Sequence, residues 1–174
     1  MKSTNWKEYI AMLLTKNNAF QLVKSEQLGQ TEKDIYTNNS KTTYEVGYID
    51  EHLIYLNLTN PRIPGYNEHT RGEYFCNNYF DIARQAKVAL EFDETNRKGI
   101  QEILESGLSG YAEQFLLNNK VVYSKLFLDD MNYQTNIDLS NRTIWQKIFG
   151  PKIENIKGIQ KQTIQLNEVF SGNR

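Results

Sequence analysis

The chain has 174 residues, of which 39% are hydrophobic, 24% charged and 12% aromatic. This composition is typical of a globular protein and excludes an intrinsically disordered chain. The formal net charge of −1 at pH 7 gives neither nucleic acid nor an anionic membrane a general electrostatic attraction to the chain.

The first predicted element is an amphipathic helix near the N-terminus. Its apolar residues recur at the i, i+3, i+4, i+7 and i+8 spacing of one helix face. They are Trp6, Tyr9, Ile10, Leu13 and Leu14. Asn5 and Glu8 have the spacing of a capping box, and Asn17-Asn18 ends the helix. We expect this helix to seal one end of the core.

Strands are predicted next. Ala19–Lys24 is typical of a short strand, whereas the polar stretch Gln27–Lys41 indicates a loop or a ragged edge. Alternating residues in Tyr44–Tyr48 predict a half-buried strand, and His52–Thr59 predicts a second one. Asp50-Glu51 lies between these two strands as a turn, so we expect a hairpin.

The middle of the chain combines a long loop with two helices. Asn60–Gly72 holds two of the three prolines and cannot continue a sheet, so it is expected on the surface. The signal over Asn78–Phe92 is mixed: its composition favours a helix, whereas Val88, Leu90 and Phe92 would also suit a strand. A further helix over Ile100–Leu108 is predicted to be capped near Thr95 and to end at Gly107–Gly110.

The clearest pattern is a second hairpin over Gly110–Asp130. Its two alternating segments are joined by Asn118-Asn119, and asparagine tolerates the positive φ that a two-residue turn requires. Two strands alone are marginal in water, so more sheet or helices must cover them.

The last predicted elements are a short helix and a strand. Ser140 is expected to cap the helix, whose apolar residues fall within Ile144–Phe149, and Gly150-Pro151 ends it. Thr163–Phe170 suggests a final strand. Because strands and helices come in clusters, residues 1–174 are predicted to form a single α+β domain. Its mostly antiparallel sheet, built from hairpins, is packed by the N-terminal helix, two central helices and the short helix.

The candidate binding residues lie in the long loop and just beyond it. They are Arg62, Tyr66, Glu68, His69, Arg71, Glu73 and Tyr74. Tyrosine and arginine are common anchors at protein interfaces. The same mixture also fits a solvated loop, and a histidine among carboxylates could perform acid–base catalysis.

An alternative site would hold a divalent metal ion. If Val88–Asp93 were a strand, Glu91 and Asp93 would share one face, and acidic residues at a strand end can bind magnesium. Together with Glu94, Glu73 and His69, these two acids would form the metal site of an enzyme that acts on phosphodiesters or a nucleotide. Capping of a helix explains these acids equally simply. No phosphate-binding loop, nucleophile elbow or zinc-protease motif occurs, so we assign no catalytic residue, metal or cofactor.

The single cysteine, Cys76, excludes a disulfide framework and is expected to be a small buried hydrophobe. No signal sequence or membrane-spanning stretch is evident, so a cytoplasmic location is expected. The many Asn, Lys and Ile residues suggest an AT-rich bacterial or phage genome. We therefore predict a non-enzymatic protein that binds another protein, such as an immunity or inhibitor protein whose partner is a toxin or nuclease. A structural or assembly subunit, which would show a large apolar patch and self-association, is a further alternative.

Overall fold

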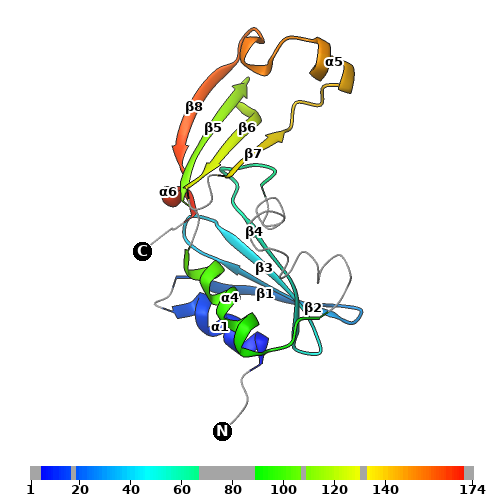
Figure 1. Ribbon diagram of the computed structural model, residues 1–174, viewed down its shortest axis with the longest axis vertical. Coiled ribbons are helices and arrows are strands. Elements are labelled where there is room, and N and C mark those ends of the chain that lie inside the picture. Colours follow the sequence, from blue (N-terminus) through cyan, green and yellow to red (C-terminus); the bar gives the residue numbers. More distant parts are fainter. Residues whose placement is uncertain (1–4, 17–18, 67–88, 107–108, 130–132, 171–174) are drawn as a thin grey trace.

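The computed structural model describes residues 5–16, 19–66, 89–106, 109–129 and 133–170. Within these residues the strands form two four-stranded antiparallel sheets, with the helices packed at their faces and ends (Figure 1). The predicted α+β class is confirmed. The strands are divided between two sheets, where the sequence indicated one.

The first sheet is a meander in which each strand pairs with the next. It contains β1 (Gln21–Leu28), β2 (Thr31–Thr37), β3 (Thr43–Ile49) and β4 (His52–Thr59). The turn Asp50-Glu51 has φ values of 49° and 68°, and two successive left-handed residues match the right-handed twist of a tight hairpin. The predicted hairpin of β3 and β4 is therefore confirmed.

Strand β2 corrects the prediction of a loop over Gln27–Lys41, and β1 also runs further than the predicted Ala19–Lys24. The inward positions of β2 include the fully buried Asp34 and Tyr36, so its inner face is partly polar. The Ser25 hydroxyl donates a hydrogen bond of 2.6 Å to Asp34 Oδ1. Hydrophobic alternation cannot reveal a strand whose inner face carries a carboxylate.

The second sheet contains the hairpin that the sequence shows most clearly. Its spatial order is β7 (Tyr133–Asp138), β6 (Lys120–Leu128), β5 (Gly110–Leu117) and β8 (Gln160–Gln165). The turn Asn118-Asn119 has φ values of 53° and 64°, as the prediction of a two-residue turn requires. The hairpin of β5 and β6 is confirmed.

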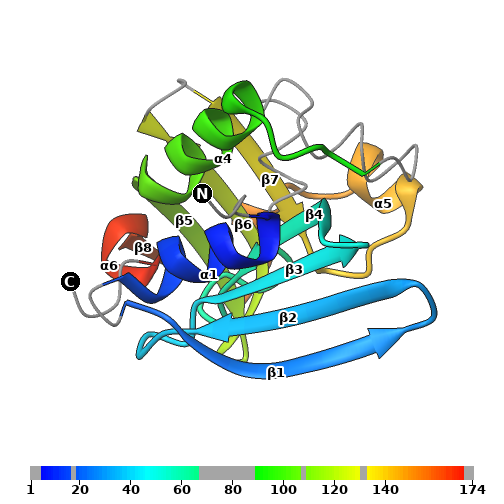
Figure 2. The same cartoon turned by 90° about the horizontal axis from the view of Figure 1, so that it is seen from below.

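Two helices pack beside the first sheet. Helix α1 (Trp6–Thr15) contacts β1 and β4 and lies against α4 (Glu94–Ser106), as Figure 2 shows from below. The Trp6 indole donates a hydrogen bond of 2.8 Å to the Leu90 carbonyl oxygen, and its ring meets Phe92 edge to face at 5.1 Å. Both helices were predicted, and the cap expected near Thr95 is Asp93.

The other predicted central helix spans Asn78–Phe92. Its residues 78–88 lie outside the described residues, so only residues 89–92 can be compared with the structure. Residues 89–92 are not helical, because Leu90 forms an isolated antiparallel bridge with Leu53 at the end of β4. The Leu90 N–H donates to the Leu53 carbonyl oxygen at 2.8 Å. At Ala89–Phe92 the helix prediction is wrong, since pairing with β4 replaces helical hydrogen bonds.

The last described element is a short helix, and the strand predicted over Thr163–Phe170 is present only as far as Gln165. Strand β8 stops at Gln165, and α6 spans Leu166–Phe170. Its apolar side chains join one continuous apolar cluster with residues of α1 and of both sheets. The buried cluster draws on both halves of the chain, for example through Ile10, Leu56, Leu126 and Val169.

Buried polar side chains fasten α6 to the first sheet. Asn60 Nδ2 donates to the Val169 carbonyl oxygen at 3.2 Å, and Asn38 Nδ2 and the Thr42 hydroxyl each donate to the Phe170 carbonyl oxygen at 3.2 Å. The last carbonyls of a helix lack partners within it. These three side chains therefore supply, from across the molecule, the donors that the end of α6 needs.

Candidate protein-binding surface

The sequence-predicted binding residues fall into three groups. Arg62 is exposed. Tyr66 is buried with 2% of its surface exposed, and its ring packs edge to face on Phe170 at 5.7 Å. Tyr66 therefore belongs to the core and does not present its ring to a partner. The remaining predicted binding residues lie outside the described residues, and their assignment stays a prediction. They are Glu68, His69, Arg71, Glu73 and Tyr74.

The described part of this loop is held against the second sheet. The Gln114 side-chain amide, fully buried on β5, donates to the Arg62 carbonyl oxygen at 2.7 Å. A hollow of about 470 Å³ opens beside the loop. It is lined by Lys41, Thr43, Thr59, Asn60, Pro61, Ile63, Pro64, Gly65 and Tyr66. The described lining brings together no group of ionisable side chains, so it does not suggest a reaction.

Of the three described acids of the alternative metal site, Asp93 and Glu94 have structural roles, and Glu91 is exposed. Asp93 Oδ1 accepts a hydrogen bond of 2.9 Å from the Asn96 N–H and so caps α4. Glu94 pairs with Arg97 one turn later at 2.9 Å. No three His, Cys, Asp or Glu side chains within the described residues come together as metal ligands would. Glu73 and His69 lie outside those residues.

The surface that the structure singles out is α5 (Ile144–Phe149), in the connection from β7 to β8. The connection joins opposite edges of the second sheet, and α5 lies at the end of the molecule remote from α1 (Figure 1). A six-residue helix is marginal by itself, because nucleation is costly. Its persistence therefore depends on its caps and on contacts with the rest of the chain.

Both ends of α5 are capped by side chains or glycine. The Thr143 hydroxyl accepts from the Gln146 N–H at 3.1 Å, and Gln146 Oε1 accepts from the Thr143 N–H at 2.8 Å, which completes a capping box. At the other end the Gly150 N–H donates to the Gln146 carbonyl oxygen at 2.9 Å. Ser140 was predicted as the cap, but its N–H instead donates to Asp138 Oδ1 at 2.9 Å.

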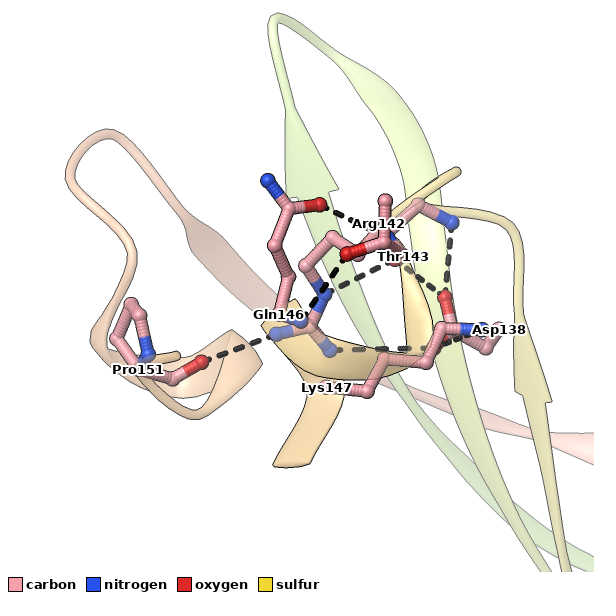
Figure 3. A network of polar contacts seen from close by, with 7 residues as sticks. Asp138, Arg142, Thr143, Gln146, Lys147 and Pro151 are labelled. Atoms are coloured by element: carbon pink, nitrogen blue, oxygen red, sulfur yellow. Dashed lines mark hydrogen bonds and ion pairs between the residues drawn. The ribbon is translucent and has the colours of Figure 1, made fainter. Parts of the chain in front are cut away.

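A carboxylate at the end of β7 anchors the polar side of α5 (Figure 3). Asp138 Oδ2 lies 3.5 Å from Lys147 Nζ and 3.8 Å from Arg142 Nη2, while Arg142 Nη1 donates to the Pro151 carbonyl oxygen at 3.0 Å. Partial burial opposes ionisation of Asp138, but hydrogen bonds from Ser140 and the Lys147 ammonium outweigh it and lower the pKa of that carboxyl. A charged Asp138 thus ties the turns on both sides of α5 together.

The apolar side of α5 faces solvent. Ile144, Trp145, Ile148 and Phe149 are between 64% and 74% exposed. The Trp145 and Phe149 rings stack with their centroids 5.3 Å apart and an interplanar angle of 17°. At spacings of i, i+1, i+4 and i+5 these side chains share one face. All six residues of α5 are exposed, and its contact with the rest of the chain is made from the polar side, through Lys147 and Asp138. A helix that packs a core instead buries its apolar side.

The segment around α5 is also basic. Residues 139–165 include five Lys or Arg residues and a single acid, Glu154. Since the whole chain has a net charge of −1, the remaining residues carry a net charge of −5. The apolar face of α5 therefore lies within the one strongly basic stretch of an otherwise acidic chain.

Comparison of the chain with protein-family models, with curated proteins and with solved structures finds no match. None of the helices in the described ranges has the length and apolar character that crossing a membrane requires. The α5 surface was missed in the sequence because its spacing was taken as that of a core-facing helix. The excess of basic residues around it was the available signal.

Proposed function

We propose that this protein works by binding another protein, and that the apolar face of α5 enters a groove on that partner. The observation that carries the proposal is the exposure of four large apolar side chains on a helix capped at both ends. Contiguous exposed apolar patches on soluble proteins mark interaction sites. Tryptophan is among the residues that most often dominate binding energy.

The anchoring of α5 favours binding over a role as an unstructured loop. Association loses free energy when side chains and backbone must become ordered. Here the capping box and the Asp138 contacts with Arg142 and Lys147 already fix the helix. The stacked Trp145 and Phe149 rings are likewise held in place. The surface is therefore preorganised, and little ordering remains for the binding step.

The partner that fits this surface has an apolar groove bordered by acidic side chains. Lys147 lies on the flank of α5, and the surrounding segment has a large excess of basic residues. Complementary charge at the rim of an interface speeds association and selects among partners. An immunity or inhibitor protein acting on a toxin or nuclease in the cytoplasm works in this way, and we propose that class by association with small proteins of AT-rich microbial genomes.

The test combines capture of the partner with measurement of its affinity. The tagged full chain is incubated with lysate of the native host, and retained proteins are identified by mass spectrometry and purified. Trp145→Ser/Phe149→Ser should weaken the purified partner's binding at least about 30-fold, as expected for loss of about 2 kcal/mol at a hot spot. Lys152→Glu, at an exposed basic residue of the same segment outside the Asp138 contacts, should also weaken binding and reduce its dependence on salt.

The matched control is Met12→Ser, which removes an apolar side chain that is 56% exposed on α1. This variant should bind the partner as the wild type does, and all variants should keep their melting temperature because exposed substitutions change stability little. Equal affinity of the α5 variant and the wild type would overturn the proposal. Binding to anionic lipid vesicles that depends on Trp145, without any protein partner, would also overturn it.

The alternative of an assembly subunit is favoured by the same exposed patch. In that case α5 would join copies of this chain, and Trp145→Ser/Phe149→Ser would lower the mass measured by light scattering. Retention of that mass by the variant would argue against self-association through α5.

A further inference from the structure

Strand β1 forms an edge of the first sheet and has an unusual exposed surface. It pairs with β2 on one side, and no described element lies beyond it (Figure 2). Its apolar side chains Leu22, Val23 and Leu28 are between 50% and 59% exposed. Such an edge offers unpaired backbone N–H and carbonyl groups to another strand.

The charges of β1 are arranged symmetrically about Ser25. Lys24 precedes Ser25 and Glu26 follows it. Lys24 is opposite Ile35 of β2, and Glu26 is opposite Lys33, so both charged side chains lie on the face away from the buried Asp34. In a two-fold symmetric antiparallel pair centred on Ser25, each Lys24 would therefore lie opposite Glu26 of the second copy, on the same face.

We infer that β1 is a self-complementary interaction surface, on which the β1 strand of a second copy of this chain pairs antiparallel in the register centred on Ser25. The first sheet of one copy (β1–β4) and the first sheet of the other copy would then form one continuous eight-stranded sheet across the dimer. Each copy contributes the same patch, as a two-fold interface requires. This inference is independent of the binding role of α5.

Charge selects this register over its neighbours. A pair centred on Lys24 would place Lys24 opposite itself, and a pair centred on Glu26 would place two carboxylates opposite each other. Like charges directly opposite are destabilising in a sheet, and opposite charges are stabilising. Lysine at an edge normally discourages pairing. Lys24 already pairs with Glu26 of its own strand, and Lys33 Nζ lies 3.5 Å from the same carboxylate. In the Ser25 register each of the two β1 charges gains a second opposite charge from the other copy, so the edge disfavours unspecific pairing and still accepts its own copy.

Two of the other three sheet edges, β8 and β4, fit a second copy less well. Strand β8 exposes a polar set of side chains, of which Lys161 and Gln162 are examples. The edge of β4 is partly occupied by the bridge between Leu53 and Leu90. Of these three edges, β1 alone combines exposed apolar residues with self-complementary charges. In the Ser25 register Leu28 of one copy lies near Leu22 and Val23 of the other.

The test is a charge exchange measured by sedimentation across a wide range of protein concentrations. The wild type should form a dimer, and Lys24→Glu or Glu26→Lys should each raise its dissociation constant about tenfold or more. Mixing the Lys24→Glu variant with the Glu26→Lys variant should restore association as a heterodimer, because the carboxylates of one copy then face the ammonium groups of the other. The Lys24–Glu26 ion pair within each chain stays broken in this mixture. Restoration separates an effect across the interface from an effect on folding.

Each of the remaining outcomes is decisive. Trp145→Ser/Phe149→Ser should leave the dimer intact, so failure of the α5 proposal does not affect this measurement. A wild type that stays monomeric at high concentration would overturn the inference. A dimer whose dissociation constant is unchanged by Lys24→Glu and Glu26→Lys would also overturn it, and so would a mixture of the two variants that does not associate.

Discussion

Tyr66 lies in the same loop as the exposed Arg62, yet its own side chain is part of the core. Truncating a buried aromatic ring leaves a cavity, so Tyr66→Ala should lower the free energy of unfolding by about 3 kcal/mol in urea denaturation. Arg62→Ala, at an exposed position four residues earlier, should change it by less than about 0.5 kcal/mol. Equal stability of the two variants would show that the Tyr66 ring is not buried.

Two other buried tyrosines make the protein sensitive to alkali. Burial, with a smaller effect of Asp34, raises the pKa of Tyr36 to about 12, and burial together with nearby Tyr36 raises the pKa of Tyr48 further. In the unfolded chain both phenols ionise near pH 10. Because the folded pKa is the higher one, the stabilising contribution is complete below about pH 10 and is lost as the pH rises through the folded pKa.

Ultraviolet titration of tyrosinate tests this sensitivity. Tyr36 and Tyr48 should remain protonated at pH 11 in the folded protein and should ionise together with unfolding. Tyr48→Phe removes one such group and also an unpaired buried hydroxyl. This variant should therefore lose less stability between pH 9 and pH 11 than the wild type. A full count of ionised tyrosines at pH 11 in folded protein would contradict the prediction.

At the level of elements, the sequence predicts most reliably where local chemistry and packing agree. The strands on both sides of Asn118-Asn119 combine strict alternation with a turn that suits positive φ, and both features persist in the structure. Strand β2 was missed because its buried face includes Asp34. The pairing of Leu90 with Leu53 was missed because it joins residues far apart in the chain, and no local pattern encodes it.

The binding surface shows the same limit. Periodicity places Ile144, Trp145, Ile148 and Phe149 on one side of α5, but it does not say whether that side meets protein or solvent. The answer depends on Asp138, which holds the opposite side through Lys147. The ion pair between Asp138 and Lys147 forms only because of the way the chain turns after β7. Residue composition alone cannot show this.

The anchoring of α5 leads to a prediction for Asp138→Asn. Removing the charge releases Lys147 and Arg142, so amide hydrogens of α5 should exchange faster while global stability changes little. The folded pKa of Asp138 is lowered, so its contribution is present above about pH 4 and is lost as the pH falls through the folded value. Protection factors of wild type and variant should therefore differ at pH 6 and converge as the pH falls below the folded pKa of Asp138.

Glu154 provides the comparison for that experiment. It pairs with Lys125 at 2.8 Å on the second sheet and does not touch α5. Glu154→Gln should leave the exchange of α5 amides unchanged at pH 6. If the two variants accelerate exchange equally, the effect is one of net charge, and Asp138 is not an anchor.

At the scale of the whole molecule, the two proposed surfaces lie on different sheets. Strand β1 borders the first sheet, and α5 lies beyond the second, at the opposite end of the molecule (Figure 1). A dimer formed through β1 would leave both α5 helices free. It would then present two binding faces, and a partner with two sites would be held by avidity in addition to the affinity of each site.

Two surfaces on different sheets can act together only if the sheets form one cooperative unit, which the Asn60 junction allows us to test. Asn60 is 3% exposed, and its Nδ2 donates to the Thr42 hydroxyl at 2.9 Å and to the Val169 carbonyl oxygen at 3.2 Å. Asn60→Ala leaves these buried groups unsatisfied and should cost about 2 kcal/mol. The free energy of opening can be measured from the exchange of the slowest amides in each strand. If residues 1–174 form a single domain, this free energy should fall by the same amount in β3 and in β6.

The exposed Asn136 on β7 supplies the control, because Asn136→Ala should leave the exchange of the slowest amides unchanged in both β3 and β6. A loss confined to β3 would mean that the sheets unfold separately in spite of their shared apolar cluster. In that case a partner bound to α5 could not stabilise the first sheet. Equal losses would mean that binding at α5 stabilises the β1 edge as well, since a ligand of the native state stabilises everything that unfolds with it.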